Sequence, residues 1–193
     1  MATKRLPDKT EAATGAKLAA ANARALLDGA DRLAGDRQYG SAGALAVLAL
    51  EEAVKARTLG AIVAAAAQGR QPGFSETDLT KIIYKSHKHR HDAGLIQHIA
   101  ANQPKIYHKL MLGQELSPVE KTAMANLIEL LASADVRKQA GFYTDFDPDT
   151  ATWSSPNDIG LPEYETVQTL VNEFVVETER QIDTFFNTLP PGK

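Results

Sequence analysis

Hydrophobic and polar residues recur with helical spacing along most of the chain, most clearly in Ser41–Ala67. On a helix that turns about 100° per residue, this segment carries one apolar stripe. The stripe consists of Leu45, Leu48, Ala49, Ala56, Leu59, Ile62, Val63 and Ala66. Glu52 falls in the middle of the stripe, Lys55 lies near it, and Glu51 is at its edge. Because charge facing a core is costly unless it is paired, these residues predict either an internal ion-pair network or a charged cleft.

The same spacing predicts further helices, separated by turns that contain Gly or Pro. The predicted helices run from Thr10 to about Ala34, over Ser41–Ala67, from Ser75 to about Ala100, over Ile106–Leu112, from Ser117 to about Ala140, and from Pro162 to about Asn187. No segment shows sustained strand alternation, and Phe142–Gly160 is expected to be irregular. The pattern predicts an all-α bundle of about five to six helices. We expect one domain over residues 10–188, with a flexible N-terminal tail at 1–9 and a C-terminal tail at 189–193.

Composition narrows the class of protein. The 193 residues carry a formal net charge of −3, so binding of nucleic acid through an overall positive charge is excluded. The chain has no cysteine, which excludes disulfides and thiolate zinc sites. The N-terminus lacks the apolar core of a signal peptide, and no run approaches the roughly 18 apolar residues of a membrane span. We therefore expect a cytoplasmic protein that does not interact with a membrane.

Charge is distributed unevenly along the chain. Basic residues and histidines gather between Lys81 and His91, whereas the stretch between Lys138 and Arg180 contains no Lys or Arg and many acidic residues. These two regions are expected to attract one another, either within a subunit or across a dimer.

The predicted third helix repeats the anomaly of the second. Arg90 projects toward the core side of that helix, with His87 one turn earlier, so either residue could pair with Glu51 or Glu52. The alternative is a solvated basic helix. His87 and His91 have a spacing that suits a metal, but the chain lacks an HExxH motif and an evident third ligand. A basic patch or a proton-transfer histidine is the simpler interpretation, and we expect no metal or cofactor.

A second group of candidates follows the end of the predicted helix near Ala140. Arg137 is suited to bind a phosphate with two donors, and the hydroxyl of Tyr143 is close in sequence. Alternatively, Arg137 interacts with the helix C-terminus and Tyr143 packs. The segment that begins at Asp145 resembles the start of a calcium loop, but its sixth and twelfth residues are not the Gly and Glu that such a loop requires. Asp145 thus remains a capping or site carboxylate.

Three segments in order carry a family resemblance: LALEEAVK at Leu48–Lys55, KSHKHR at Lys85–Arg90, and RKQAGFYTDFDPDTATWSSP at Arg137–Pro156. Together they resemble the AbiV family of phage abortive-infection proteins over about Ala20 to Phe186. That family is similar to the HEPN (higher eukaryotes and prokaryotes nucleotide-binding) superfamily, so the resemblance implies a HEPN-like helical bundle.

Many HEPN proteins are metal-independent ribonucleases that dimerise and place an R-x(4–6)-H motif at the dimer cleft. The resemblance implies that Arg137 is the motif arginine and Lys138 the following polar residue, and Tyr143 stands where the histidine would be. The candidate catalytic residues are Arg137, Tyr143, His87 and Glu52, and the candidate binding residues are Glu51, Lys55, Arg90, Lys138 and Asp145.

Two functions follow as hypotheses. The first is an RNA-targeting antiphage toxin, a possible metal-independent endoribonuclease that acts on tRNA or mRNA. A phage-encoded protein would activate it, and the resemblance implies that it is a homodimer. The second is a non-catalytic module that binds a protein or nucleotide and sequesters a phage or host partner. Tyr143 favours the second hypothesis, because tyrosine is a weaker base than histidine at neutral pH.

Overall fold

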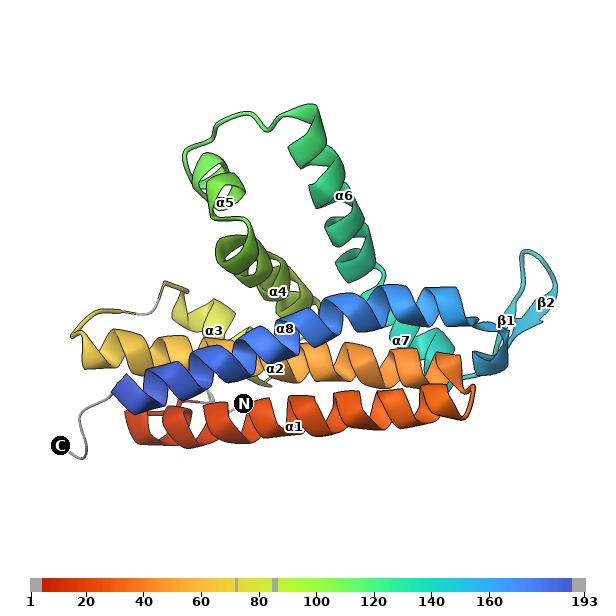
Figure 1. The fold of residues 1–193 in the computed structure, drawn as a ribbon, viewed down its shortest axis with the longest axis horizontal. Helices are drawn as coiled ribbons and strands as arrows, with labels where there is room; N and C mark the ends of the chain where they lie inside the picture. The colour runs from red at the N-terminus through yellow and green to blue at the C-terminus, as the bar shows by residue number, and fades with distance from the viewer. Residues whose placement is uncertain (1–4, 72, 85–86, 189–193) are drawn as a thin grey trace.

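The computed structural model describes residues 5–71, 73–84 and 87–188, and this part of the chain is mainly helical (Figure 1). Its elements, in order, are α1 (Lys9–Gly35), α2 (Tyr39–Ala67), α3 (Glu76–Tyr84), α4 (His87–Asn102), α5 (Pro104–Met111), α6 (Pro118–Ala132), α7 (Ala134–Phe142), β1 (Asp145–Asp147), β2 (Thr152–Ser154), the 3₁₀ helix η1 (Pro156–Asp158) and α8 (Leu161–Thr188). An all-α fold is therefore confirmed.

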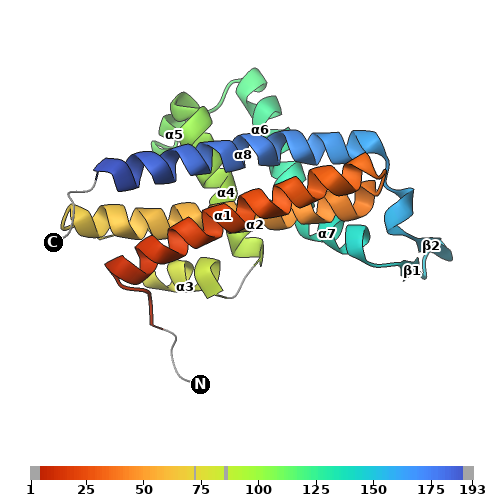
Figure 2. The same cartoon turned by 60° about the horizontal axis from the view of Figure 1, so that its bottom comes forward.

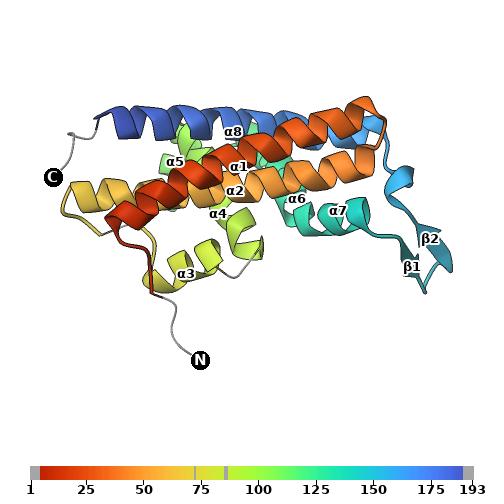
Figure 3. The same cartoon turned by 90° about the horizontal axis from the view of Figure 1, so that it is seen from below.

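Helix α2 is the centre of the bundle. Helices α1 and α8 run beside it along the long axis of the molecule (Figures 1 and 2). Helices α3 and α7 lie along another side of α2, and α4 also contacts it (Figure 3). Because α2 has neighbours on most sides, it is apolar nearly all round rather than along one stripe. Glu51, placed at the edge of the predicted stripe, is buried for this reason.

The expectation of five to six helices is wrong, because the described residues form eight α-helices. The predicted helix from Ser75 is two helices, α3 and α4, and the residues between them lie outside the described part. The predicted helix from Ser117 divides at Ser133, whose φ of −86° and ψ of −4° leave the regular helical conformation. This turn lets α6 leave the bundle while α7 follows α2 (Figure 1). The spacing of hydrophobic residues does not indicate that the chain changes direction between α6 and α7.

The segment predicted to be irregular contains a small hairpin at one end of the bundle (Figure 1). Strands β1 and β2 are antiparallel, and Phe146 pairs with Trp153. The Asp147 carboxylate accepts hydrogen bonds from the backbone N–H groups of Asp149 and Thr150, which stabilises the turn. Three-residue strands are too short to show a clear alternation in the sequence.

Helices α5 and α6 project from the bundle as an arm (Figure 1). Ser117 and Glu120 form a capping box at the start of α6. The Glu120 carboxylate also accepts hydrogen bonds from Lys109 Nζ of α5, at 2.8 and 2.9 Å. These bonds lower the pKa of Glu120 to about 2, the Lys109 bond being the largest cause. The arm is thus joined by an ion pair between its two helices.

Helix α7 approaches the backbone of α2 closely at Gly141. A Cβ atom on Gly141 would collide with the carbonyl oxygen of Gly40 and with the Cβ of Ala44. The hydroxyl of Ser41 donates a hydrogen bond to the carbonyl oxygen of Gly141 at 3.3 Å. The absence of a side chain at Gly141 therefore sets how near α7 lies to the centre of the fold.

Gly141→Ala is expected to destabilise the protein by about 1–3 kcal/mol, because backbone atoms must move to accept the methyl group. The free energy of unfolding in urea measures this loss. Gly43→Ala is the matched control: a Cβ there meets nothing within 4 Å, and alanine in a helix interior is expected to stabilise by about 0.5–1 kcal/mol. Equal effects of the two substitutions would contradict the close approach.

Candidate functional site

Glu51 is the centre of a buried charge cluster that joins three helices. Glu51 lies at the middle of α2, and the residue is 1% exposed. Its Oε2 atom accepts a hydrogen bond from Arg90 Nη1 of α4 at 3.2 Å, and its Oε1 atom accepts one from Lys138 Nζ of α7 at 3.1 Å. His91 Nε2 of α4 lies 3.3 Å from the same Oε1 atom but without the alignment of a hydrogen bond. We call Glu51, Arg90, His91 and Lys138 the Glu51 cluster.

Both cations of the Glu51 cluster have a second acceptor. Arg90 Nε donates to the carbonyl oxygen of Ile82, at 2.9 Å, which ties α4 to α3. Lys138 Nζ lies 2.9 Å from Asp135 Oδ1, one turn earlier on α7. A buried carboxylate requires such compensation, because removing its water costs several kcal/mol. The Glu51 cluster is therefore a self-paired network that holds α4 and α7 against α2.

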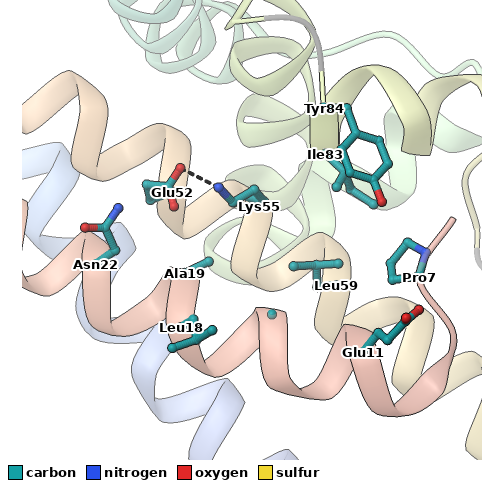
Figure 4. A pocket seen from close by; sticks show the side chains of 11 residues that line it. Pro7, Glu11, Leu18, Ala19, Asn22, Glu52, Lys55, Leu59, Ile83 and Tyr84 are labelled. Carbon is teal, nitrogen blue, oxygen red and sulfur yellow. Dashed lines mark hydrogen bonds and ion pairs between the residues drawn. The ribbon is translucent and has the colours of Figure 1, made fainter. Parts of the chain in front are cut away.

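Glu52 and Lys55 lie in a different place, in a groove between α1, α2 and α3 (Figure 4). Lys55 Nζ donates to Glu52 Oε1 at 2.6 Å, within one turn of α2. The groove has a volume of about 570 Å³, and Asn22 and Leu59 also line it. Adjacent residues of a helix point about 100° apart, so Glu51 and Glu52 face different neighbours. The structure thus places Glu51, not Glu52, among the basic groups of several helices.

Arg137 has a different environment from its neighbour Lys138. Its Nε atom donates to Ser133 Oγ at 2.9 Å. It lines a cavity of about 210 Å³ between α2, α7 and α8, together with Tyr164 and Glu163. No carboxylate of the described residues lies within ion-pair distance of Arg137. The Arg137 residue is only partly buried.

Tyr143 and Asp145 are on the surface beyond the end of α7. Tyr143 is the C-cap residue, and its side chain is 61% exposed. Its ring meets that of Phe142 edge to face, with centroids 6.5 Å apart. Asp145 begins β1, and its carboxylate accepts a hydrogen bond from the N–H of Phe146. The side chain of His87, the remaining candidate, lies outside the described part of the structure.

The candidates therefore fall into three groups. Glu51, Arg90 and Lys138 meet in the buried cluster, Glu52 and Lys55 share the α1–α3 groove, and the residues around the end of α7 form the third group. Among the described residues, no group of three or more His, Asp or Glu side chains could hold a metal ion.

A model of the family described as AbiV, a HEPN family, matches residues 11–172. This chain belongs to the AbiV family. The match extends from α1 into α8 and confirms the resemblance inferred from the sequence. Neither the curated proteins nor the solved structures contain a match to this chain. Membership of the AbiV family suggests an abortive-infection protein, and the helical fold is consistent with a HEPN-like bundle.

Sequence reasoning missed several buried polar residues of this AbiV protein, among them His91 and Arg57. His91 was considered only with His87 as a metal ligand, although it follows Arg90 and is 5% exposed beside Glu51. Arg57, on α2, is 8% exposed and bonds to α8. A single-stripe description of α2 hides Arg57, because it assumes that the helix has only one buried face. In the described part of the chain, no helix has both the length and the apolar character needed to cross a bilayer.

Glu51→Gln is expected to destabilise this AbiV protein by about 3–5 kcal/mol, because it leaves Arg90 without a negative partner and leaves buried Lys138 with only the exposed Asp135. Denaturant unfolding measures the change. The matched control is Glu52→Gln, the same substitution one residue later. It breaks only a pair within one helical turn and is expected to cost about 1 kcal/mol or less. If the two variants lose equal stability, the Glu51 cluster does not have the role assigned to it.

Proposed function

We propose that this protein is an abortive-infection toxin that acts on RNA and blocks translation or growth when a phage infects the cell. The proposal rests on membership of the AbiV family together with the state of Arg137. Among the candidate cations, Lys55, Arg90 and Lys138 each have a carboxylate partner. Arg137 has none in the described part of the chain, so its charge is available to an anionic ligand.

A guanidinium group suits the phosphate of an RNA backbone, because it offers two parallel N–H donors and a permanent charge. In the proposed reaction, Arg137 binds the phosphate at the cleavage site and stabilises the negative charge that develops in the transition state. As the 2′-oxygen attacks the phosphorus, the bond to the 5′-oxygen breaks and a 2′,3′-cyclic phosphate forms. The exposed side chain of Tyr143, beyond the end of the same helix, assists transfer of the 2′-hydroxyl proton, and the leaving 5′-oxygen takes up a proton. Neither role requires a metal.

In this proposal the Glu51 cluster positions the reacting groups and does not touch RNA. Lys138 is the residue after Arg137, and its bond to Glu51 fixes the rotation of α7 against α2. Arg137 is thereby directed to the cavity between α2, α7 and α8. We further propose that two copies of the chain form a homodimer that presents two Arg137 side chains to one RNA, and that a phage-encoded protein activates it in the cytoplasm.

A second candidate function is a non-catalytic binding module. One observation favours it: aromatic side chains are exposed where the bundle ends. Trp153 is 70% exposed, and its ring centroid lies 5.2 Å from that of Phe146 on the neighbouring strand. Exposed aromatic rings are typical of protein–protein interfaces. In this alternative, the hairpin binds a phage or host protein and the charged residues serve only the fold.

The test is RNA cleavage by purified protein in the presence of EDTA, with total RNA as substrate, with and without lysate from phage-infected cells. Arg137→Ala is expected to lower the rate of cleavage by about 100-fold, the effect of removing one donor to a charged transition state. Arg180→Ala is the matched control and is expected to retain activity, because Arg180 is exposed on α8 and paired with Glu177. Circular dichroism checks that both variants fold.

Two results would contradict the RNA-directed mechanism. One is intact RNA under all conditions, and the other is unchanged toxicity of Arg137→Ala in cells. If RNA stays intact while Trp153→Ala abolishes both protection and capture of a phage protein, the binding module is the correct function.

A further inference from the structure

Arg57 is a buried cation that forms an ion pair with no carboxylate of the described residues. It lies on α2, two turns beyond the Glu51 cluster, and is 8% exposed. Its Nε atom donates to Thr178 Oγ1 at 2.8 Å, and its Nη2 atom donates to the carbonyl oxygen of Phe174 at 3.1 Å. Its guanidinium carbon lies 3.9 Å from the centroid of the Phe174 ring. These contacts fix the group against α8 but supply no negative charge.

The remaining donors of Arg57 are unused. The Nη1 atom donates to no acceptor among the described residues, and no ion pair involves this side chain there. The carboxylate that raises the pKa of Arg57 is that of Glu177, which is already bonded to Arg180 and Gln181. Burial lowers the pKa of Arg57 to about 10, which reflects the cost of keeping this charge out of water.

Arg57 lines a cavity of about 220 Å³ between α2 and α8. On the α2 side the lining residues are small: Gly60, Ala61 and Ala64. On the α8 side, Ile182 and Phe185 supply an apolar wall. Several of these residues are only half-buried, so the cavity opens to solvent. A buried cation with unused donors thus adjoins an accessible space that is mainly apolar.

We propose that this cavity binds a small monocarboxylate, whose anionic head pairs with Arg57 and whose apolar body lies between Ala64 and Phe185. One negative charge matches Arg57, the one charged residue among those that line this cavity, whereas a phosphate dianion would bring an uncompensated charge into an apolar site. The volume admits a molecule of the size of hexanoate but not a nucleotide. The site is separate from the Glu51 cluster and from Arg137, so it does not depend on the proposed action on RNA.

The proposal is tested by calorimetric titration of the full chain with sodium hexanoate at constant ionic strength. The wild-type protein is expected to bind one hexanoate with a dissociation constant of about 1 mM. Hexanol, which has the same apolar body without the charge, and inorganic phosphate are expected to bind at least about tenfold more weakly. Equal binding of phosphate or hexanol would overturn the assignment of a monocarboxylate.

Two variants and a control locate the site. Arg57→Met is expected to weaken hexanoate binding at least about tenfold, because it removes the charge and keeps much of the side-chain volume. Ala64→Leu is expected to do the same by filling the cavity while Arg57 stays in place, so the test survives if Arg57→Met does not fold. Arg24→Met is the control: Arg24 Nε bonds to Glu179 Oε1 of α8 at 2.9 Å, outside the cavity, and its loss is expected to leave binding unchanged.

Two results would overturn the proposed monocarboxylate site. If the wild-type protein binds no hexanoate, or if Arg57→Met and Ala64→Leu bind it as the wild type does, Arg57 only ties α2 to α8 and the proposal is wrong.

Discussion

The fold depends on one buried carboxylate. Glu51 is surrounded by helices, so its carboxylate loses its hydration. Ion pairs with Arg90 and Lys138, which come from two other helices, compensate for this loss. A buried network of this kind adds little net stability compared with an apolar core of the same volume, but removing one member leaves the others unpaired. Its effect is therefore to fix which helices meet and in what rotation. Helix α7 is held twice, by Lys138 and by the close contact between Gly141 and Gly40.

The division of the charges follows from this constraint. Consecutive residues on a helix point in different directions. Because Lys138 is bonded to Glu51, its neighbour Arg137 faces the cavity between α2, α7 and α8. The same holds on α2, where Glu51 faces α4 and α7 while Glu52 faces the groove beside α1. One residue of each adjacent pair serves the fold, and the other is left closer to the surface. In α7 the residue closer to the surface is Arg137, to which the proposed function assigns the binding of RNA.

Much of the fold could be predicted from the sequence, because hydrophobic spacing and the turn residues Gly and Pro identify α1, α2 and α8 to within about two residues. The pairing of Arg90 with Glu51 or Glu52 was also foreseen, since two helices with charge on their core sides need each other. The choice of Glu51 was not, because it requires knowing that α2 is enclosed on most sides. The break at Ser133 and the β1–β2 hairpin escaped for a related reason: both depend on contacts between distant segments and leave no periodic signal.

The central claim is that the Glu51 carboxylate couples α7 to α2 through Lys138. A double-mutant cycle measures that coupling directly, with Glu51→Gln, Lys138→Met and the double variant compared by their free energies of unfolding. The account predicts a coupling energy of about 1–3 kcal/mol, because each single substitution removes the ion pair between Glu51 and Lys138 while the other charged group stays buried. Additive effects of the two substitutions, with a coupling energy near zero, would contradict it.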